Sequence, residues 1–233
     1  KIIKDKFFDY WEGINSSSNL ISFGDHGDCF SSEELTQANS SSFQVNCQSF
    51  TGKVKIGQLG KHNIKNALAA VAISCALGVD FDTVAKGLMK TPKIFGRLFW
   101  VKGERFNILD DSYNSNPRAL SAAIDVLCFE KGEKWIVLGD MLELGLNAQD
   151  LHDESIIKMN EAGVNRLFTV GSFSAKSSLH FERISENFTD VDDLISRLTA
   201  LIRASENKVS VLIKGSRAFN LDLVVEALKE ANV

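Results

Sequence analysis

The sequence predicts an α/β protein whose larger, C-terminal part is a mostly parallel sheet with helices on both faces. Three observations support this fold class. Short, uninterrupted apolar segments such as Trp135–Leu138 are typical of strands that are buried on both sides. Segments with apolar residues at helical spacing separate these strands, as in a parallel sheet with crossover helices. Polar, glycine-containing turns such as Gly139-Asp140 follow the strands, where a parallel sheet binds its ligands.

The first 60 residues have a different character. Residues 14–50 are rich in Ser and Asn, and we expect Ser40–Ser42 to be among the loosest stretches. Alternating runs at Phe43–Phe50 and Lys53–Gln58 flank Thr51-Gly52, which predicts an antiparallel hairpin that turns there. The hydrophobic pattern before residue 60 is too sparse for an independent core. This region is therefore expected to be the tail end of a domain.

Two helices and then a strand–helix alternation follow. Helical spacing predicts a helix from Asn63 to Leu77, stopped by Gly78, and a second from Phe81 to Met89. Pro92 marks a domain boundary, so the predicted domains are 1–92 and 93–233. The elements expected beyond it are strands Leu98–Val101 and Phe106–Leu109, helix Ala119–Phe129, strand Trp135–Leu138, helix His152–Ala162, strand Leu167–Val170, helix Val191–Ala204, strand Val209–Ile213 and helix Leu221–Ala231.

The composition argues against several functional classes. Of 233 residues, 44% are hydrophobic and 24% are charged, which is ordinary for a globular protein. A formal charge of −4 gives no electrostatic reason to expect nucleic acid or an anionic membrane as partner. The longest apolar run, Ala67–Leu77, is well short of the ~18 residues that span a bilayer. The four cysteines form no C-x-x-C pair, so neither a zinc site nor a disulfide framework is indicated, and a reducing cytoplasm fits best.

Two strand ends carry candidate ligand-binding groups. Asp110-Asp111 could bind a metal, act as a base or receive ribose hydroxyls; equally, one of the pair could cap the turn before the helix that starts at Asn116-Pro117. Lys214 and Arg217 flank an expected helix N-terminus and could hold an anion together with its backbone N–H groups. Ordinary surface charge explains these two side chains as well.

Other suggestive segments are better explained as structural. Gly57–Lys61 resembles a phosphate loop but is followed by His62 where a Ser or Thr is needed, and no G-x-G-x-x-G occurs. Asp25–Cys29 contains metal-ligand residue types among turn formers, so a solvated turn is predicted. His152 opens a predicted helix, where a neutral surface role is expected, and isolated His180 is expected to be structural or exposed.

Taken together, five segments resemble the Mur ligase family in order and spacing. They are Gly60–Ala70, Gly96-Arg97, Asp110–Pro117, Leu138–Gly145 and Lys214–Arg217. The last two narrow the resemblance to the member that joins D-alanyl-D-alanine to UDP-N-acetylmuramoyl-tripeptide in peptidoglycan synthesis. The resemblance runs from about residue 20 to the C-terminus. It implies a Rossmann-like C-terminal domain that binds the amino substrate, preceded by the end of a central ATP-binding domain.

The resemblance implies an ATP-dependent amide ligase that works in the cytoplasm as a monomer. ATP, with Mg²⁺, would phosphorylate the tripeptide carboxylate, and the amine of D-alanyl-D-alanine would then attack the acyl phosphate and release phosphate. Nucleotide contacts are implied for His62, Asn63 and Asn66 near the adenine, Arg97 at the phosphates and Asp111 at the ribose. Dipeptide contacts are implied for Tyr113, Asn114, Ser115, Asn116, Lys214 and Ser216.

Other family motifs are missing from the printed sequence. It contains no G-x-x-G-K-[ST] loop, and neither the family's metal-binding residues nor its carbamoylated lysine can be assigned in it, so its catalytic residues stay unknown and it has no predicted metal ligands. We expect a C-terminal fragment of such a ligase, without the UDP-binding domain and inactive by itself. Two alternatives remain open: a non-catalytic binding or regulatory module that keeps this fold, and a ligase similar to folylpolyglutamate synthase.

Overall fold

The computed structural model describes residues 13–14, 21–25, 27–37, 40–48, 50–90 and 94–231. The chain separates into two compact units, Lys1–Lys93 and Ile94–Val233, hereafter the N-terminal and the C-terminal unit. Each is described by itself. None of the helices in the described part of the chain combines the length and the apolar character that a membrane span needs.

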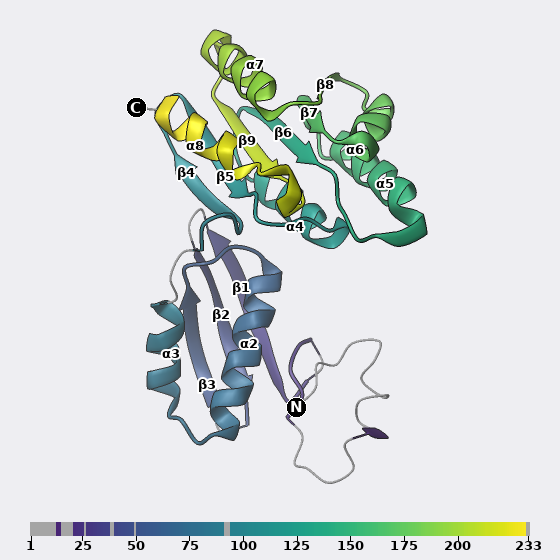
Figure 1. The fold of residues 1–233 in the computed structure, drawn as a ribbon. Coiled ribbons are helices and arrows are strands. Elements are labelled where there is room, and N and C mark those ends of the chain that lie inside the picture. Colours follow the sequence, from purple (N-terminus) through teal and green to yellow (C-terminus); the bar gives the residue numbers. More distant parts are fainter. Residues whose placement is uncertain are drawn as a thin grey trace. The chain divides into compact units, whose positions relative to one another are not determined.

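The N-terminal unit is a three-stranded antiparallel sheet packed against two helices (Figure 1). Its core gathers apolar side chains from both layers, among them Phe43 and Val45 of the sheet and Ile64 and Leu68 of a helix. The Asp80 side chain caps the second helix by accepting from Thr83 N. The elements are β1 (Cys29–Gln37), β2 (Ser40–Cys47), β3 (Phe50–Ile56), α2 (Lys61–Ala76) and α3 (Phe81–Met89).

The predicted hairpin exists, but its turn was placed wrongly. Cys47 pairs with Phe50, so the chain reverses between these two residues and Gly52 lies inside β3. Gly52 is needed for space, because a Cβ there would lie 2.3 Å from the Phe81 ring of α3. The serine run 40–42 is also not loose: it forms the start of β2, and the buried Ser41 hydroxyl donates to Gln58 O at 2.9 Å.

The C-terminal unit is a six-stranded sheet in the order β4-β5-β9-β6-β7-β8. Only β4 is antiparallel to its neighbour, so the predicted mostly parallel sheet is confirmed. Its strands are β4 (Phe99–Lys102), β5 (Phe106–Asp111), β6 (Glu133–Gly139), β7 (Arg166–Val170), β8 (Ile184–Phe188) and β9 (Val209–Lys214).

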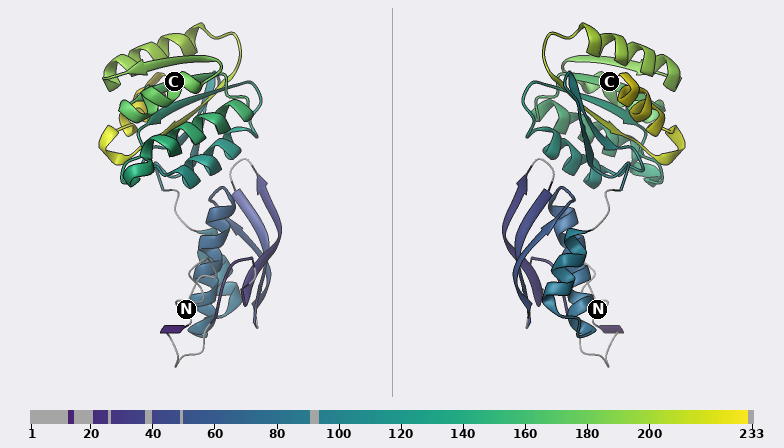
Figure 2. Two further views of the ribbon diagram at one scale, coloured as in Figure 1. Left: turned by 90° about the vertical axis from the view of Figure 1, so that its right-hand side faces the viewer. Right: turned by 90° about the vertical axis from the view of Figure 1, so that its left-hand side faces the viewer.

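Helices cover both faces of this sheet, again as predicted (Figure 2). α4, α5 and α6 pack side by side on one face, and α7 and α8 pack together on the other. The helical segments are α4 (Pro117–Leu127), α5 (Ala148–Glu161), α6 (Ser172–Ser177), α7 (Val191–Ala204) and α8 (Asp222–Ala231), with 3₁₀ turns η1 (Gly145–Asn147), η2 (Ser178–His180) and η3 (Arg217–Phe219).

The sequence missed β1, α6 and β8. β8 lies at the edge of its sheet and β1 at the edge of the smaller one, so each has a neighbouring strand on one side only. Both strands are largely polar, with partly exposed side chains, and they give no buried apolar run. α6 has six residues, fewer than two turns, which is too short for a helical period to be visible.

Candidate functional site

Three loops meet where β5, β9 and β6 end, because the carboxyl ends of neighbouring parallel strands share one edge of the sheet. Asp111 of β5 is level with Lys214 of β9, and Lys214 is level with Leu138 of β6. The following glycines come close: a Cβ on Gly215 would lie 2.8 Å from the Gly139 Cα. Only glycine at both positions lets these two strand ends approach so closely.

Asp110 organises the turn after β5. Its buried carboxylate accepts from Gly96 N at 2.9 Å, from Ser112 N at 3.2 Å and from the Ser112 hydroxyl at 2.7 Å. The helix α4 is capped by Asn116, whose side chain accepts from Ala119 N at 2.8 Å. Asp110 thus caps the turn before the helix, as one of the two sequence interpretations had it, while the helix itself is capped by Asn116.

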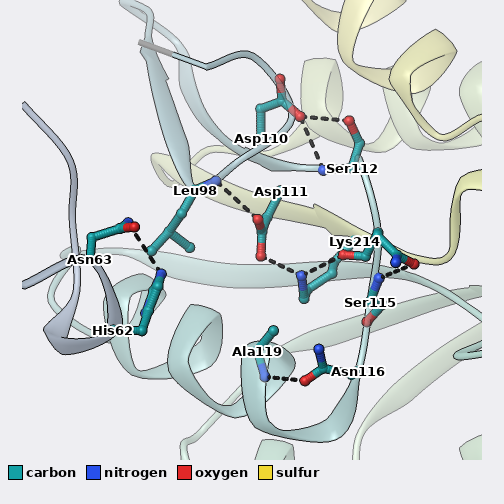
Figure 3. Close-up of polar contacts among 11 residues, drawn as sticks. His62, Asn63, Leu98, Asp110, Asp111, Ser112, Ser115, Asn116, Ala119 and Lys214 are labelled. Atoms are coloured by element: carbon teal, nitrogen blue, oxygen red, sulfur yellow. Dashed lines mark hydrogen bonds and ion pairs between the residues drawn. The ribbon is translucent and has the colours of Figure 1, made fainter. Parts of the chain in front are cut away.

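Asp111 and Lys214 form a buried ion pair (Figure 3). The Lys214 side chain is 1% exposed, and its ammonium donates to Asp111 Oδ2 at 2.5 Å and to Asn114 O at 2.9 Å. Asp111 Oδ1 accepts from Leu98 N at 3.0 Å. Burial raises the pKa of the Asp111 carboxyl, while the Lys214 ammonium and the Leu98 N–H pull that pKa back down.

The turn after β9 differs from the one expected. It leads into the three-residue η3, and α8 begins only at Asp222, so no long helix N-terminus faces Lys214 and Arg217. Arg217 pairs with Asp222 at 2.9 Å. No long helix N-terminus therefore contributes to an anion site here, and the alternative of ordinary surface charge is wrong for Lys214, whose side chain is buried.

Arg97 and Tyr113 lie at the exposed rim of this edge. The Arg97 guanidinium stacks over the Tyr113 ring, 4.4 Å from its centroid, and both side chains are exposed. Gly96 has φ 75°, and a Cβ there would lie 3.1 Å from the Tyr113 Cβ. Gly96 thus brings the two chain segments close enough for the stacking contact.

Asn114 and Ser115 complete the loop between β5 and α4. The Asn114 side chain is exposed, and its Oδ1 accepts from Ser115 N at 2.8 Å. The Ser115 hydroxyl is buried, yet no described residue gives it a hydrogen bond. A buried hydroxyl without a partner is uncommon, and its position beside the Asp111–Lys214 pair makes it a candidate ligand contact.

Ser216 joins the turn after β9 to the loop after β6. Its hydroxyl accepts from Leu142 N at 2.8 Å, and its own N–H donates to Asp140 O at 3.1 Å. The Asp140 carboxylate in turn accepts from Phe173 N, Ser174 N and the Ser174 hydroxyl at the start of α6. The loops after β6, β7 and β9 are therefore locked together by hydrogen bonds.

His152 was wrongly expected at the surface. It lies inside α5, is fully buried, and its Nε2 accepts from Met141 N at 2.9 Å. Its Nδ1 lies 2.6 Å from Ala148 O, which fixes Nδ1 as the protonated nitrogen. Sequence reasoning missed this residue and the anchoring role of Asp140. No pattern in the sequence signals either role, because both depend on how α5 and α6 pack against the end of β6. His180 is exposed, as expected.

The remaining predicted nucleotide contacts lie in the N-terminal unit, on the first two turns of α2. Asn63 Nδ2 donates to Leu59 O at 2.8 Å and lies 3.2 Å from His62 Nε2. Asn66 Nδ2 donates to Asn63 Oδ1 at 3.3 Å, and the His62 and Asn66 side chains are exposed. These three residues form one polar surface at the start of the helix.

The described residues include no group of three or more His, Cys, Asp or Glu side chains that could hold a metal ion. In the Asp25–Cys29 segment, the Asp28 carboxylate accepts from the backbone N–H and the hydroxyl of Ser22, as in a structural turn. His26 of this segment lies outside the described residues.

The fold and the locked loops define an α/β domain with a mostly parallel sheet, a class of fold in which ligands bind at the carboxyl edge of the sheet. Residues 96–217 match the family described as "Mur ligase, glutamate ligase domain", and the chain belongs to this family.

Two similar proteins are named more narrowly. The UDP-N-acetylmuramoyl-tripeptide–D-alanyl-D-alanine ligase of Escherichia coli K12 is 39% identical over 172 residues, which cover 73% of this chain and 38% of that protein. The crystal structure of MurF from Acinetobacter baumannii matches 98% of this chain and 51% of that one, with a TM-score of 0.88 and 29% identity. The chain thus spans about half the length, or less, of these relatives.

A MurF ligase of Thermotoga maritima, solved in complex with ADP, has a TM-score of 0.79 to this chain at 22% identity. The match covers 97% of this chain and 52% of that one. At this identity the likeness concerns the fold alone.

Proposed function

We propose that this chain provides the ribose-holding and amino-substrate-holding parts of an ATP-dependent ligase that joins D-alanyl-D-alanine to UDP-N-acetylmuramoyl-tripeptide. The observation that carries the proposal is the Ser115 hydroxyl, buried without a described partner beside the Asp111–Lys214 pair. Such a group gains a hydrogen bond when a polar ligand enters. The names of the relatives supply the substrates.

The reaction has two steps. The tripeptide carboxylate attacks the γ-phosphorus of ATP and ADP leaves, which gives an acyl phosphate. The dipeptide amine then attacks the acyl carbon, loses a proton, and inorganic phosphate leaves from the tetrahedral intermediate. The task of the described residues is to hold the nucleotide and the amine in place, which converts an encounter in solution into a reaction between neighbouring groups.

On the nucleotide side, Asp111 receives the ribose hydroxyls. Its two described hydrogen bonds leave acceptor sites free, because a carboxylate has about four. Arg97 contacts the phosphates: its guanidinium is exposed, always charged and bidentate. His62, Asn63 and Asn66 contact the adenine from α2.

On the amine side, Ser115 and Ser216 donate hydroxyl hydrogen bonds to the dipeptide. Lys214 has three ammonium protons and gives two of them to Asp111 and Asn114, so one remains for the dipeptide carboxylate. Tyr113, Asn114 and Asn116 have exposed side chains at the rim and contact the dipeptide backbone.

Mg²⁺ belongs to the proposed reaction, but the described residues offer no carboxylate or imidazole cluster to hold it. We assign no step of this chain's chemistry to the metal. Residues 1–92 are proposed as the end of the ATP-binding domain and 93–233 as the amino-substrate domain. Because the printed sequence contains no G-K-[ST] phosphate loop, the 233 residues by themselves are expected not to turn over ATP.

Isothermal calorimetry of the chain with D-alanyl-D-alanine and with L-glutamate tests the amine side. We expect heat of binding with the dipeptide only, and a dissociation constant about tenfold larger for Ser115→Ala, as expected for one lost hydrogen bond. The stability of Ser115→Ala should equal or exceed that of the parent, because an unpartnered buried hydroxyl is removed.

Ligation by the complete product of the reading frame that contains this sequence tests the whole reaction. Formation of ADP and the ligated peptide is the expected result. Binding of glutamate in place of the dipeptide would contradict the proposal in favour of a folylpolyglutamate synthase-like ligase. No ligation by the complete product would favour a non-catalytic module.

A further inference from the structure

A chain of contacts runs from His152 to Ser216. His152 Nε2 accepts from Met141 N, and the next residue, Leu142, donates its N–H to the Ser216 hydroxyl. The His152 ring stacks on Phe173 at 5.4 Å with an interplanar angle of 22°, which places the imidazole against the first turn of α6 as well. One buried side chain therefore contacts both the loop after β6 and the helix that follows β7.

The two hydrogen bonds of the His152 imidazole fit only one tautomer of the ring. Nδ1 donates to Ala148 O, so the proton is on Nδ1 and Nε2 carries the lone pair that meets the Met141 N–H. Because both nitrogens are engaged and the side chain is fully buried, the ring has one orientation. The Met141 and Leu142 backbone is held in turn, and with it the direction of the Leu142 N–H.

The consequence concerns the proton of the Ser216 hydroxyl. A hydroxyl has one proton and two lone pairs, and the Leu142 N–H occupies one lone pair. Among the described residues none accepts the Ser216 hydroxyl proton, so this proton is available for an anionic ligand group. The direction in which it can point depends on where the Leu142 N–H sits.

We propose that His152 is a positioning residue that, through the Met141–Leu142 backbone, holds the Ser216 hydroxyl ready to donate to the carboxylate of the amino substrate. This inference rests on the proposed function, since it concerns the same amino-substrate site. His152 does not touch substrate itself. Its effect is on how well the site is formed before the substrate arrives.

Three variants distinguish a positioning role of His152 from an effect on the stability of the protein alone. His152→Gln supplies an amide oxygen close to where Nε2 lies, so it keeps an acceptor for the Met141 N–H. His152→Phe fills a similar space and keeps a ring against Phe173, but it has no acceptor. Ile156→Val is the matched control: it weakens the packing of the same helix at another fully buried position, with the histidine left in place.

The first measurement is hydrogen exchange of the 233-residue chain by NMR. The Met141 amide should exchange at least about tenfold faster in His152→Phe, and at nearly the parent rate in His152→Gln and Ile156→Val. Equal exchange in all four proteins would overturn the contact on which the inference depends. This measurement does not require ligase activity.

The second measurement is the steady-state kinetics of the complete reading-frame product, at a temperature where all variants are folded. His152→Phe should raise the KM for D-alanyl-D-alanine about tenfold and leave the KM for ATP within twofold, and His152→Gln should restore most of the loss. An unchanged dipeptide KM, or an equal rise in Ile156→Val, overturns the positioning role. If the unaltered enzyme does not ligate at all, the proposed function fails, and this inference fails with it.

Discussion

Replacing Lys214 by methionine removes the ammonium from the centre of the candidate site and keeps a side chain of similar length. The Asp111 carboxylate then remains buried, with Leu98 N as its described donor and no cation beside it. Removing one partner of a buried ion pair costs about 3–5 kcal/mol. The Asp111 side chain is 14% exposed, so water reaches it in part and the low end applies: about 3 kcal/mol.

The free energy of unfolding is best measured in urea, because a non-ionic denaturant does not screen the charges under study. Two of the three tryptophans, Trp100 and Trp135, lie buried in the C-terminal unit, so in a Trp11→Phe background tryptophan fluorescence reports on the unfolding of this unit. For a unit of this size, 3 kcal/mol corresponds to a fall in Tm of about 10 °C. A loss below about 1 kcal/mol would refute the reasoning.

The double variant Lys214→Met/Asp111→Asn is the control. It leaves a neutral amide that still accepts from Leu98 N, so no charge is left unpaired. We expect it to regain about half or more of the lost stability, which a double-mutant cycle reports as a coupling energy. A double variant no more stable than Lys214→Met would show that lost packing, and not the uncompensated charge, causes the effect.

The pH dependence of the stability lost in Lys214→Met tests independently whether the unpaired Asp111 carboxylate causes that loss. Burial already raises the pKa of the Asp111 carboxyl, and removing Lys214 takes away the largest opposing influence, so the folded-state pKa rises further. A folded pKa above the unfolded value means that acid favours folding. The loss in free energy of unfolding should therefore be complete above the folded-state pKa of Asp111. It should shrink as the pH falls towards about 3.9, the pKa of the aspartate in the unfolded chain. A deficit that grows on acidification would contradict this assignment.

Three further predictions follow from other contacts. Gly215→Ala should lower the free energy of unfolding in urea by about 2 kcal/mol or more, because the new Cβ would lie 2.8 Å from the Gly139 Cα. In native protein, Cys29 and Cys47 should resist Ellman's reagent until urea is added, since both are buried and burial raises the pKa of both thiols. Arg97→Lys should raise the KM for ATP of the complete enzyme about tenfold, because an ammonium lacks the bidentate fork, and an unchanged KM would count against a phosphate contact.

The parallel sheet was predictable because its inner strands are buried on both faces, and such strands show as apolar runs such as Trp135–Leu138 in β6. The edge strand β8 lacks this signal: its sequence is ISENF, its side chains are partly exposed, and it was missed. Gly52 shows a second limit. The residues around it resemble a turn. The structure instead requires glycine there because the Phe81 ring, 29 positions further along the chain, leaves no space for a side chain.

The strand ends that carry the candidate site could be predicted from their polar residues, but the partner of each residue could not. Lys214 and Asp111 are 103 positions apart and meet because β9 lies beside β5 in a particular register. The buried state of His152 has the same origin, since it depends on how α5 lies against the end of β6. A pattern within one segment carries no information about such pairings.

The pairing also changes what Lys214 can contribute. An ammonium bound to a carboxylate adds little net positive charge to the site, so Lys214 cannot act as a free cation that attracts phosphates. Its two described bonds instead hold Asp111 on β5 and Asn114 in the following loop. The exposed guanidinium of Arg97 is better suited to attract an anion, because its positive charge faces solvent. Lys214 therefore shapes the site, and Arg97 is the residue whose removal should weaken the salt-dependent attraction of ATP.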